Sequence, residues 1–356
     1  MSNLSILVVS KSAPLLSELL RTIPGSLEGF GGDVEVLCSW NGSPEDEKKV
    51  EVPGGIELYF SQREPYHFAK NCNQLARQAC GDLLLFINDD VSLNIGAIQA
   101  AIHTLETRDQ CGIVGAKLIN KNGHVGHAGI LFDQTHKPFH RYLNCPADHP
   151  LTERTERVPA TTGAFLVTRA QDYARCPMNE TYINNGEDVE LCLCFSMRLG
   201  LHTYICHAAK GFHPERSTRS NDNVDAGFGN DNSQDLLRTR KIRQQYLETL
   251  NREELAHELN LASRESSWCH QQISSLETYQ QEILIEAERI KSQALKQEAQ
   301  KEEKISASNL QLLAELALEE ARQSANKEIS QGFLHSERAR QRTQTWKETF
   351  RSSRGT

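Results

Sequence analysis

The chain has 356 residues, of which 38% are hydrophobic, 6% aromatic and 24% charged, a balance typical of a folded protein of one or two domains. Its formal net charge is -8 and it has no large basic cluster, which excludes a nucleic-acid-binding protein as the first interpretation. The longest uninterrupted apolar run, residues 83–87, is far shorter than the roughly 20 residues of a membrane-spanning helix.

The first two thirds of the chain alternate between strand and helix patterns. Short β-branched or apolar runs predict strands at 4–10, 34–39, 56–60 and 82–87. Helical spacing follows Pro14, and a second helix is predicted over 68–79, ending at Gly81, a residue that suits the left-handed cap. Repeated strand–helix units predict an α/β fold with a mostly parallel sheet, whose ligand crevice lies at the carboxyl ends of the strands.

Two adjacent carboxylates, Asp89 and Asp90, follow the predicted strand at 82–87. Alone they would repel a diphosphate, but carboxylate oxygens are also the ligands through which Mg²⁺ or Mn²⁺ is shared with a phosphate substrate. The alternative is structural: Asp90 or Ser92 caps the helix predicted over 95–105, and Asp89 lies in the turn before it. The pair alone favours the structural interpretation.

Several motifs follow one another in a fixed order along residues 4–219. They are the strand and loop at 6–12, Trp40-Asn41-Gly42-Ser43, the helix and strand over 71–90 that end in Asn88-Asp89-Asp90, the glycine-rich segments at 112–118 and 123–129, Thr162-Gly163-Ala164, Gly186-Glu187-Asp188, and Gly211-Phe212-His213. In this order they resemble the family 2 glycosyltransferases, especially the rhamnosyl- and galactosyltransferase-like members. The resemblance implies a Rossmann-like GT-A catalytic domain.

The resemblance also implies a role for each motif. Asp90 would be a direct ligand of Mn²⁺ or Mg²⁺, His213 would complete the metal site, and Asp188 would be the catalytic base. Glu187 would be a second catalytic residue that orients the acceptor or supports that base, although both acids also suit a plain helix N-terminus. The residues implied to bind the nucleotide sugar are Ser10, Lys11, Trp40, Asn41, Asn73, Arg77, Asn88, Asp89, Gly163 and Ala164.

The turn after the second predicted strand departs from the family pattern. Trp40-Asn41 replaces the acid with which these enzymes often read the nucleobase. Trp40 either stacks on a base or is a packed aromatic. The nucleobase of the donor is therefore left open.

Together these motifs predict a metal-dependent, inverting glycosyltransferase. It would move a sugar from a UDP-, dTDP- or GDP-sugar to a glycan, lipid-linked or protein acceptor, in surface polysaccharide biosynthesis. The Gln-x-x-Arg-Trp signature of processive synthases is absent, so transfer is expected to be non-processive. The alternative is a catalytically degenerate scaffold whose helical region mediates protein assembly.

The remaining histidines and cysteines give no second metal site. The spacing of Cys192 and Cys194 with Cys206 lacks the usual paired gaps of structural zinc. Four histidines, His124, His127, His136 and His140, are expected to be loop residues rather than a metal cluster.

A second domain is predicted over residues 236–356. All 11 prolines lie at or before Pro214, and the later chain is rich in good helix formers. A seam of near-heptad spacing runs through Leu255, Leu259, Ala262, Ser266, Cys269, Ile273, Leu276, Gln280, Ile283, Ala287, Ile290 and Ala294. The seam slips near 301–308, where the helix would break or turn back. The boundary is thus placed at 235/236.

This helical region is expected to form a coiled coil that makes a homo-oligomer or docks a partner, because isolated helices draw stability from burying an apolar face. A solvent-exposed helix without a partner is the alternative. The N-terminus lacks the basic and long apolar segments of a secretory signal. A cytoplasmic location is therefore expected, with peripheral attachment to a membrane left open.

Overall fold

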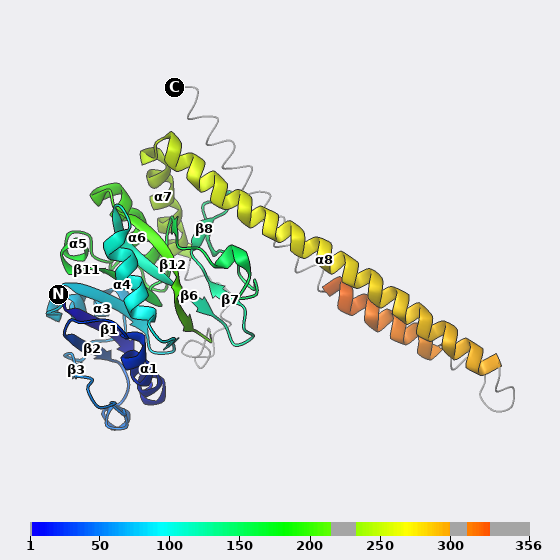
Figure 1. Cartoon of the computed structure of the whole chain (residues 1–356), viewed down its shortest axis with the longest axis horizontal. Coiled ribbons are helices and arrows are strands. Elements are labelled where there is room, and N and C mark those ends of the chain that lie inside the picture. The colour runs from blue at the N-terminus through cyan, green and yellow to red at the C-terminus, as the bar shows by residue number, and fades with distance from the viewer. Residues whose placement is uncertain (1, 215–232, 300–311, 328–356) are drawn as a thin grey trace. The chain divides into compact units, whose positions relative to one another are not determined.

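The computed structural model describes residues 2–214, 233–299 and 312–327 (Figure 1). The chain divides into two compact units, Met1–Glu258 and Leu259–Thr356. This division lies later than 235/236 because helix α7 (Ser233–Thr249) packs against α6 (Glu187–Cys194) of the first unit. The composition change therefore precedes the structural division by one helix.

A ten-stranded mixed sheet forms the centre of the first unit, in the order β10-β12-β6-β11-β4-β1-β2-β3, with β5 paired to β12 and β7 to β6. The strands are β1 (Leu4–Ser10), β2 (Val34–Trp40), β3 (Leu58–Phe60), β4 (Leu83–Asn88), β5 (Ser92–Leu93), β6 (Cys111–Ile119), β7 (Val125–His127), β10 (Glu156–Val158), β11 (Phe165–Arg169) and β12 (His202–Phe212). Strands β1 to β4, β6 and β12 share one direction, and β5, β7, β10 and β11 run against it. The predicted α/β fold with a mostly parallel sheet is confirmed.

Helices cover both faces of this sheet. The further helices of the first unit are α1 (Ala13–Ser26), α2 (Pro44–Glu47), α3 (Phe68–Gln78), α4 (Ala97–Thr107) and α5 (Ala170–Arg175), and a π-helical turn, Phe195–Leu199, follows α6. The core on one face includes residues of α1 and α4, and the core on the other includes residues of α3, α6 and α7. A small second sheet pairs β8 (Ile130–Phe132) with β9 (Pro138–His140).

Local sequence explains where α1 begins and which face it buries. The side chain of Ser12 accepts a hydrogen bond from the N–H of Leu15, and a proline lies in the first turn. Leu16, Leu19, Leu20 and Ile23, spaced as one helical face, are fully buried against the sheet. This packing fixes the turn that follows β1.

The register of the central strands brings their carboxyl ends to one edge. Val9 of β1 lies opposite Asn88 of β4, and Ser10 lies opposite Trp40 of β2. Strand β11 runs against β4, with Phe165 opposite Ile87, so the residues before β11 reach the same edge. The segments that the sequence predicted to bind ligand therefore start from a common rim.

The second unit is helical where it is described. Helix α8 (Arg252–Ala299) crosses the division between the units, and residues 312–327 form another helical segment. Gln280 Nε2 donates a hydrogen bond to Asn326 Oδ1 over 3.1 Å, so the two helical segments contact each other (Figure 1). The helical prediction is confirmed, while the predicted break near 301–308 lies outside the described residues. Within the described ranges, no helix combines the length and apolar character needed to cross a bilayer.

Candidate active site

A carboxylate and an imidazole meet at the rim of the sheet. Asp90 follows the end of β4, and His213 follows the end of β12. Asp90 Oδ1 lies 3.1 Å from His213 Nε2, and the two side chains are 5% and 18% exposed. The backbone N–H of His213 donates to the carbonyl of Ile119 over 2.8 Å, which continues the β12–β6 pairing and holds the backbone at His213. The structure brings together the two residues that the resemblance implied as metal ligands.

The donor set suits a cation shared with a ligand. A carboxylate oxygen and an imidazole nitrogen are both acceptable to Mn²⁺, and Mg²⁺ is usually held by one or two carboxylates together with phosphate and water. Among the residues that the structure describes, no group of three or more His, Cys, Asp and Glu side chains is placed to hold a metal. Two protein ligands fit an ion that takes its other ligands from a substrate diphosphate.

Asp89 is directed toward β1. Its Oδ2 accepts a hydrogen bond from Ser10 Oγ over 2.7 Å, which links the ends of β1 and β4. Burial raises the pKa of Asp89 to about 6, and the charge of Asp90 contributes to this rise. The hydrogen bond from Ser10 and the charge of Lys11 oppose the rise in pKa. Lys11 is the exposed residue that follows Ser10. Asp89 is therefore held by the strand edge, while Asp90 faces His213.

Asp188 lies on the same rim, in the first turn of α6. Its Oδ2 accepts the N–H of Gly163 over 2.8 Å, and its Oδ1 accepts the N–H of Val189 over 2.7 Å. The carbonyl of Ala164 accepts the N–H of Asn88 over 3.2 Å. The Gly163–Ala164 segment thus connects the Asp188 carboxylate to the end of the strand that carries Asp90.

Glu187 is buried immediately before Asp188. Gly186 precedes it as the N-cap of α6, with φ 107, and the acids Glu187, Asp188 and Glu190 occupy the first turn. Acids stabilise this end of a helix because the peptide dipoles leave it positive. The structural interpretation of the acidic pair, a helix N-terminus, therefore describes the structure, and the catalytic role of the pair stays a prediction.

Trp40 is not available to a nucleobase. Only 1% of its surface is exposed. Its Nε1 donates to the carbonyl of Ser43 over 2.9 Å, and its ring meets Phe60 edge-on with the centroids 6.0 Å apart. The packed interpretation of Trp40 describes the structure, because a ring enclosed by its own core presents no free face for stacking.

Asn41 holds the turn beside Trp40. Its N–H donates to the carbonyl of Ser10 and its Nδ2 to the carbonyl of Glu64, each over 2.7 Å. Within the described part of the chain, its buried Oδ1 has no hydrogen-bond partner. A buried amide oxygen without a partner is uncommon in a folded protein.

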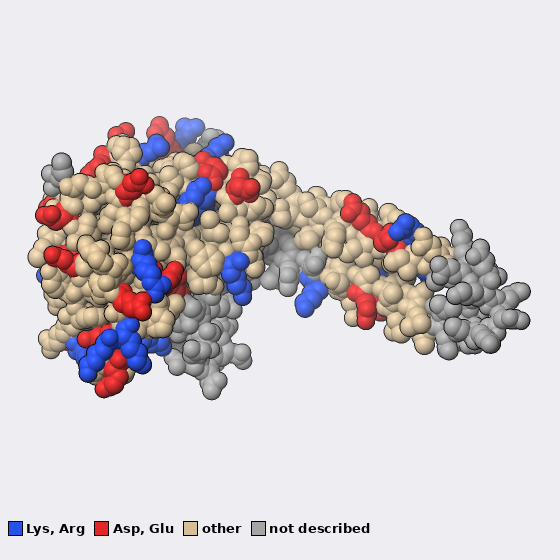
Figure 2. Space-filling model, turned by 60° about the horizontal axis from the view of Figure 1, so that its bottom comes forward, with Lys and Arg blue, Asp and Glu red and all other residues tan. Residues whose placement is uncertain are grey.

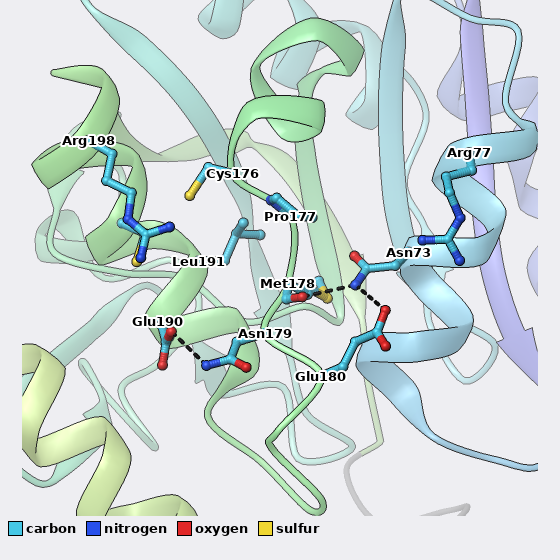
Figure 3. A pocket seen from close by; sticks show the side chains of 11 residues that line it. Asn73, Arg77, Cys176, Pro177, Met178, Asn179, Glu180, Glu190, Leu191 and Arg198 are labelled. Atoms are coloured by element: carbon cyan, nitrogen blue, oxygen red, sulfur yellow. Dashed lines mark hydrogen bonds between the residues drawn. The ribbon is translucent and has the colours of Figure 1, made fainter.

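Asn73 and Arg77 lie at a different place. Asn73 Nδ2 donates to the carbonyl of Met178 and to Glu180 Oε1, each over 2.9 Å, and its Oδ1 accepts from the Tyr173 hydroxyl over 2.6 Å. Both residues line a cavity of about 380 Å³ (Figure 3). Asp90, Asp188 and His213 are not among the residues that line it. The implied nucleotide role of Asn73 gives way to a structural one, because its amide is fully used in holding this segment.

Two histidines near the rim were not expected to have a role. His127 of β7 is buried; its Nε2 lies 2.9 Å from Thr161 Oγ1, and its Nδ1 lies 2.8 Å from Nδ1 of His140. Burial lowers the pKa of His127 well below its usual value, and His140 and His213 lower it further. The expectation of loop histidines is wrong for His127 and His140, because they lie in strands β7 and β9. The fold places the His127 ring against Thr161, two residues before Gly163.

The surface carries charges of both signs. On the face that Figure 2 shows, Lys and Arg side chains lie among Asp and Glu side chains and form no single basic patch. This face therefore gives no support to a nucleic-acid partner.

Part of this chain is similar in sequence to a known protein. Over 231 residues the chain is 28% identical to the O-antigen biosynthesis protein RfbC of Myxococcus xanthus, an alignment that covers 62% of this chain and 18% of RfbC. No family model matches the chain. The chain thus spans less than a fifth of the length of this relative.

Solved structures with a similar fold include two that hold a nucleotide and Mn²⁺. GalNAc-T7 with UDP, GalNAc and Mn²⁺ gives a TM-score of 0.45 at 12% identity, covering 60% of this chain and 44% of that one. The mannosyltransferase PcManGT of Pyrobaculum calidifontis with GDP-Man and Mn²⁺ gives 0.41 at 13% identity, covering 61% and 58%.

Proposed function

We propose that this protein is a metal-dependent, inverting and non-processive glycosyltransferase. It would transfer a sugar from a nucleotide diphosphate donor to a glycan, lipid-linked or protein acceptor in surface polysaccharide biosynthesis. One observation carries the proposal: the Asp90–His213 pair and the Asp188 carboxylate reach one rim of the sheet and are connected through Gly163 and Ala164.

The chain's own groups divide the work of the reaction. Asp188 Oδ2 is fixed by the Gly163 N–H, so the carboxylate is held in place to accept the proton of an acceptor hydroxyl. That hydroxyl oxygen then attacks the anomeric carbon from the face opposite the diphosphate, which inverts the configuration. Asp90 and His213 would hold the Mn²⁺ or Mg²⁺ ion, which neutralises charge on the departing diphosphate when it is bound.

Asn41 is the residue best suited to contact the nucleobase. Its buried Oδ1 has no hydrogen-bond partner among the described residues beside the Ser10 end of β1. A movement of this turn would expose the oxygen to the ring N–H that uracil, thymine and guanine each carry. The base would then be read by an amide oxygen in place of a carboxylate. Trp40 supports this turn from within the core.

Nucleotide binding tests the proposal. The melting temperature is measured with UDP, dTDP and GDP, each with Mn²⁺ and with a chelator; a ligand at 100 times its dissociation constant stabilises a fold by about 2.7 kcal/mol. We expect a rise with at least one nucleotide that disappears in the chelator. The matched control is Asp82→Asn, an exposed acid before β4, which should bind as the wild type does, whereas Asp90→Asn should not. No shift with any nucleotide would favour the scaffold alternative.

We also propose that the helical region joins copies of this chain. Its described part leaves large aliphatic side chains exposed: Ile285, Ile290, Leu312, Leu313 and Leu316. Solvent exposure of several aliphatic residues on neighbouring helical segments is unfavourable, and association with a second chain would cover them. Such an assembly would place several transfer sites together for a polymeric or membrane-borne acceptor at the cytoplasmic face.

A further inference from the structure

The first helix after the sheet, α7, contacts the loop that leads to Asp188. Asp235 is the third residue of α7, and only 1% of its surface is exposed. Its Oδ2 accepts three backbone N–H groups, from Ile183 over 3.1 Å, from Asn184 over 2.8 Å and from Asn185 over 3.4 Å. One carboxylate thus anchors the three residues that precede the α6 N-cap, Gly186.

A second contact reaches Gly186 itself. Gly186 has φ 107, and a Cβ built there would lie 2.5 Å from Thr239 Oγ1 and 2.8 Å from the ring of Tyr182. Thr239 lies one turn beyond Asp235, and its Oγ1 donates to the Asp235 carbonyl over 2.9 Å. Successive turns of α7 therefore hold both the loop and the capping glycine.

The charge on Asp235 is used for this contact. Buried carboxylates are costly unless they are paired or hydrogen-bonded, and here the partners are three loop amides and Arg238 Nη1 at 3.1 Å. An acid that served only the dipole of its own helix would gain nothing by being buried against another segment. The side chain is directed at the loop, two residues before the Glu187-Asp188 pair.

We propose that Asp235 is a positioning residue for the base Asp188: α7 fixes the 183–186 segment and so sets where α6 starts and where the Asp188 carboxylate lies. The inference rests on the proposed function, in which Asp188 accepts the acceptor proton. A catalytic group displaced by about 1 Å can cost on the order of a hundredfold in rate. The helical composition that starts at 236 would then begin inside the catalytic unit.

The test compares full-length Asp235→Asn with Glu248→Gln, an exposed acid on the same helix. Hydrogen–deuterium exchange is measured at the amides of 183–185, together with kcat, donor KM and nucleotide binding. In Asp235→Asn we expect faster exchange at these amides, unchanged exchange in β4, and a kcat lower by about ten- to a hundredfold. Donor KM should stay within about twofold, and Glu248→Gln should match the wild type throughout.

Three results would overturn the inference, and the first two are unchanged exchange at 183–185 and faster exchange there with wild-type kcat. Equal losses in nucleotide binding and kcat, with faster exchange also in β4, would overturn it as well, because the effect would then be general unfolding. Asp188→Asn separates this from the proposed function. If Asp188→Asn is inactive and Asp235→Asn is fully active, only the inference about Asp235 fails. If Asp188→Asn is active, both the proposed base and its positioning residue are wrong.

Discussion

Each acid at the rim is set apart by its partners. Asp90 faces the imidazole of His213. Asp89 accepts a hydrogen bond from a hydroxyl group of β1, and Asp188 accepts hydrogen bonds from two backbone N–H groups. Backbone donors fix a carboxylate more firmly than flexible side chains do, because they carry no rotamer freedom of their own. The three carboxylates of the site therefore differ in the groups that hold them.

The role of Asp188 can be tested by removing its charge while keeping its shape. We expect Asp188→Asn to lower kcat by about 10²–10⁴-fold, the usual contribution of a general base, with nucleotide binding retained. Steady-state transfer and thermal shift measure the two effects. Glu190→Gln, on the same helix and bonded to Asn179, is the control and should keep most of its activity; an Asp188→Asn variant near wild-type turnover would place the base elsewhere.

His127 predicts a dependence of stability on pH. Its folded-state pKa lies well below the ordinary 6.5, so the unfolded chain binds the proton first, and the free energy of unfolding falls as the pH drops below about 6.5. One such histidine contributes up to about 1.4 kcal/mol per pH unit. Between pH 7.5 and 5.5, the free energy of unfolding measured with urea should fall less in His127→Gln than in the wild type. An equal fall in the two proteins would show that protonation of His127 does not cause the pH dependence.

The sequence predicted which motif residues follow the ends of strands. It did not predict the contacts that depend on how side chains pack. Asp90 and His213 follow strands β4 and β12, and parallel strands deliver their carboxyl ends to one edge. Asp188 lies in the first turn of helix α6, and only the family resemblance indicated it. Trp40 and Asn73 sit in matching motifs, yet their side chains are used up by Ser43 and by the 173–180 segment. The contacts of His127 and Asp235 join segments 34 and about 50 residues apart, which no local pattern reports.

At the scale of elements, the 161–164 segment depends on close packing with β6. A Cβ at Gly115 of β6 would lie 1.9 Å from Thr161 Oγ1 and 2.9 Å from Ile205 Cδ1. Strand β6 can approach Thr161 only because position 115 has no side chain. The glycine in β6 therefore shapes the segment that holds Asp188.

This packing predicts the cost of a single methyl group. Gly115→Ala should lower the free energy of unfolding by about 1–3 kcal/mol, the usual cost of overpacking a core. Gly54→Ala is the matched control, since a Cβ there would meet no atom within 4 Å. Urea unfolding midpoints compare the two variants, and equal midpoints would contradict the close approach.

At the scale of the whole molecule, composition and packing divide the chain at different places. The loss of proline after Pro214 marks the start of helical sequence, but α7 still belongs to the unit that holds the sheet. Composition reports which residues favour helix, whereas domain membership depends on which surface a helix covers. The helical region was thus predictable, and its boundary was not.

Truncation tests the role of the second unit. A chain ending at Glu258 should stay folded, bind nucleotide and have a lower oligomeric mass in light scattering, because it keeps α7 and loses the exposed aliphatic side chains beyond it. A chain ending at residue 232, which lacks α7, should be less stable than the longer one. Equal oligomeric order in the full chain and in the chain ending at Glu258 would contradict self-association through these helices.

The central claim is that Asp90 and His213 hold a divalent ion against the diphosphate of a nucleotide while Asp188 faces the sugar. A crystal structure with Mn²⁺ and UDP, dTDP or GDP, with the ion located by its anomalous scattering, tests this most directly. We expect Mn²⁺ bonded to Asp90, to His213 and to phosphate oxygens, with Asp188 across the sugar site from the diphosphate. A nucleotide bound elsewhere, or an ion that contacts neither Asp90 nor His213, would contradict the account.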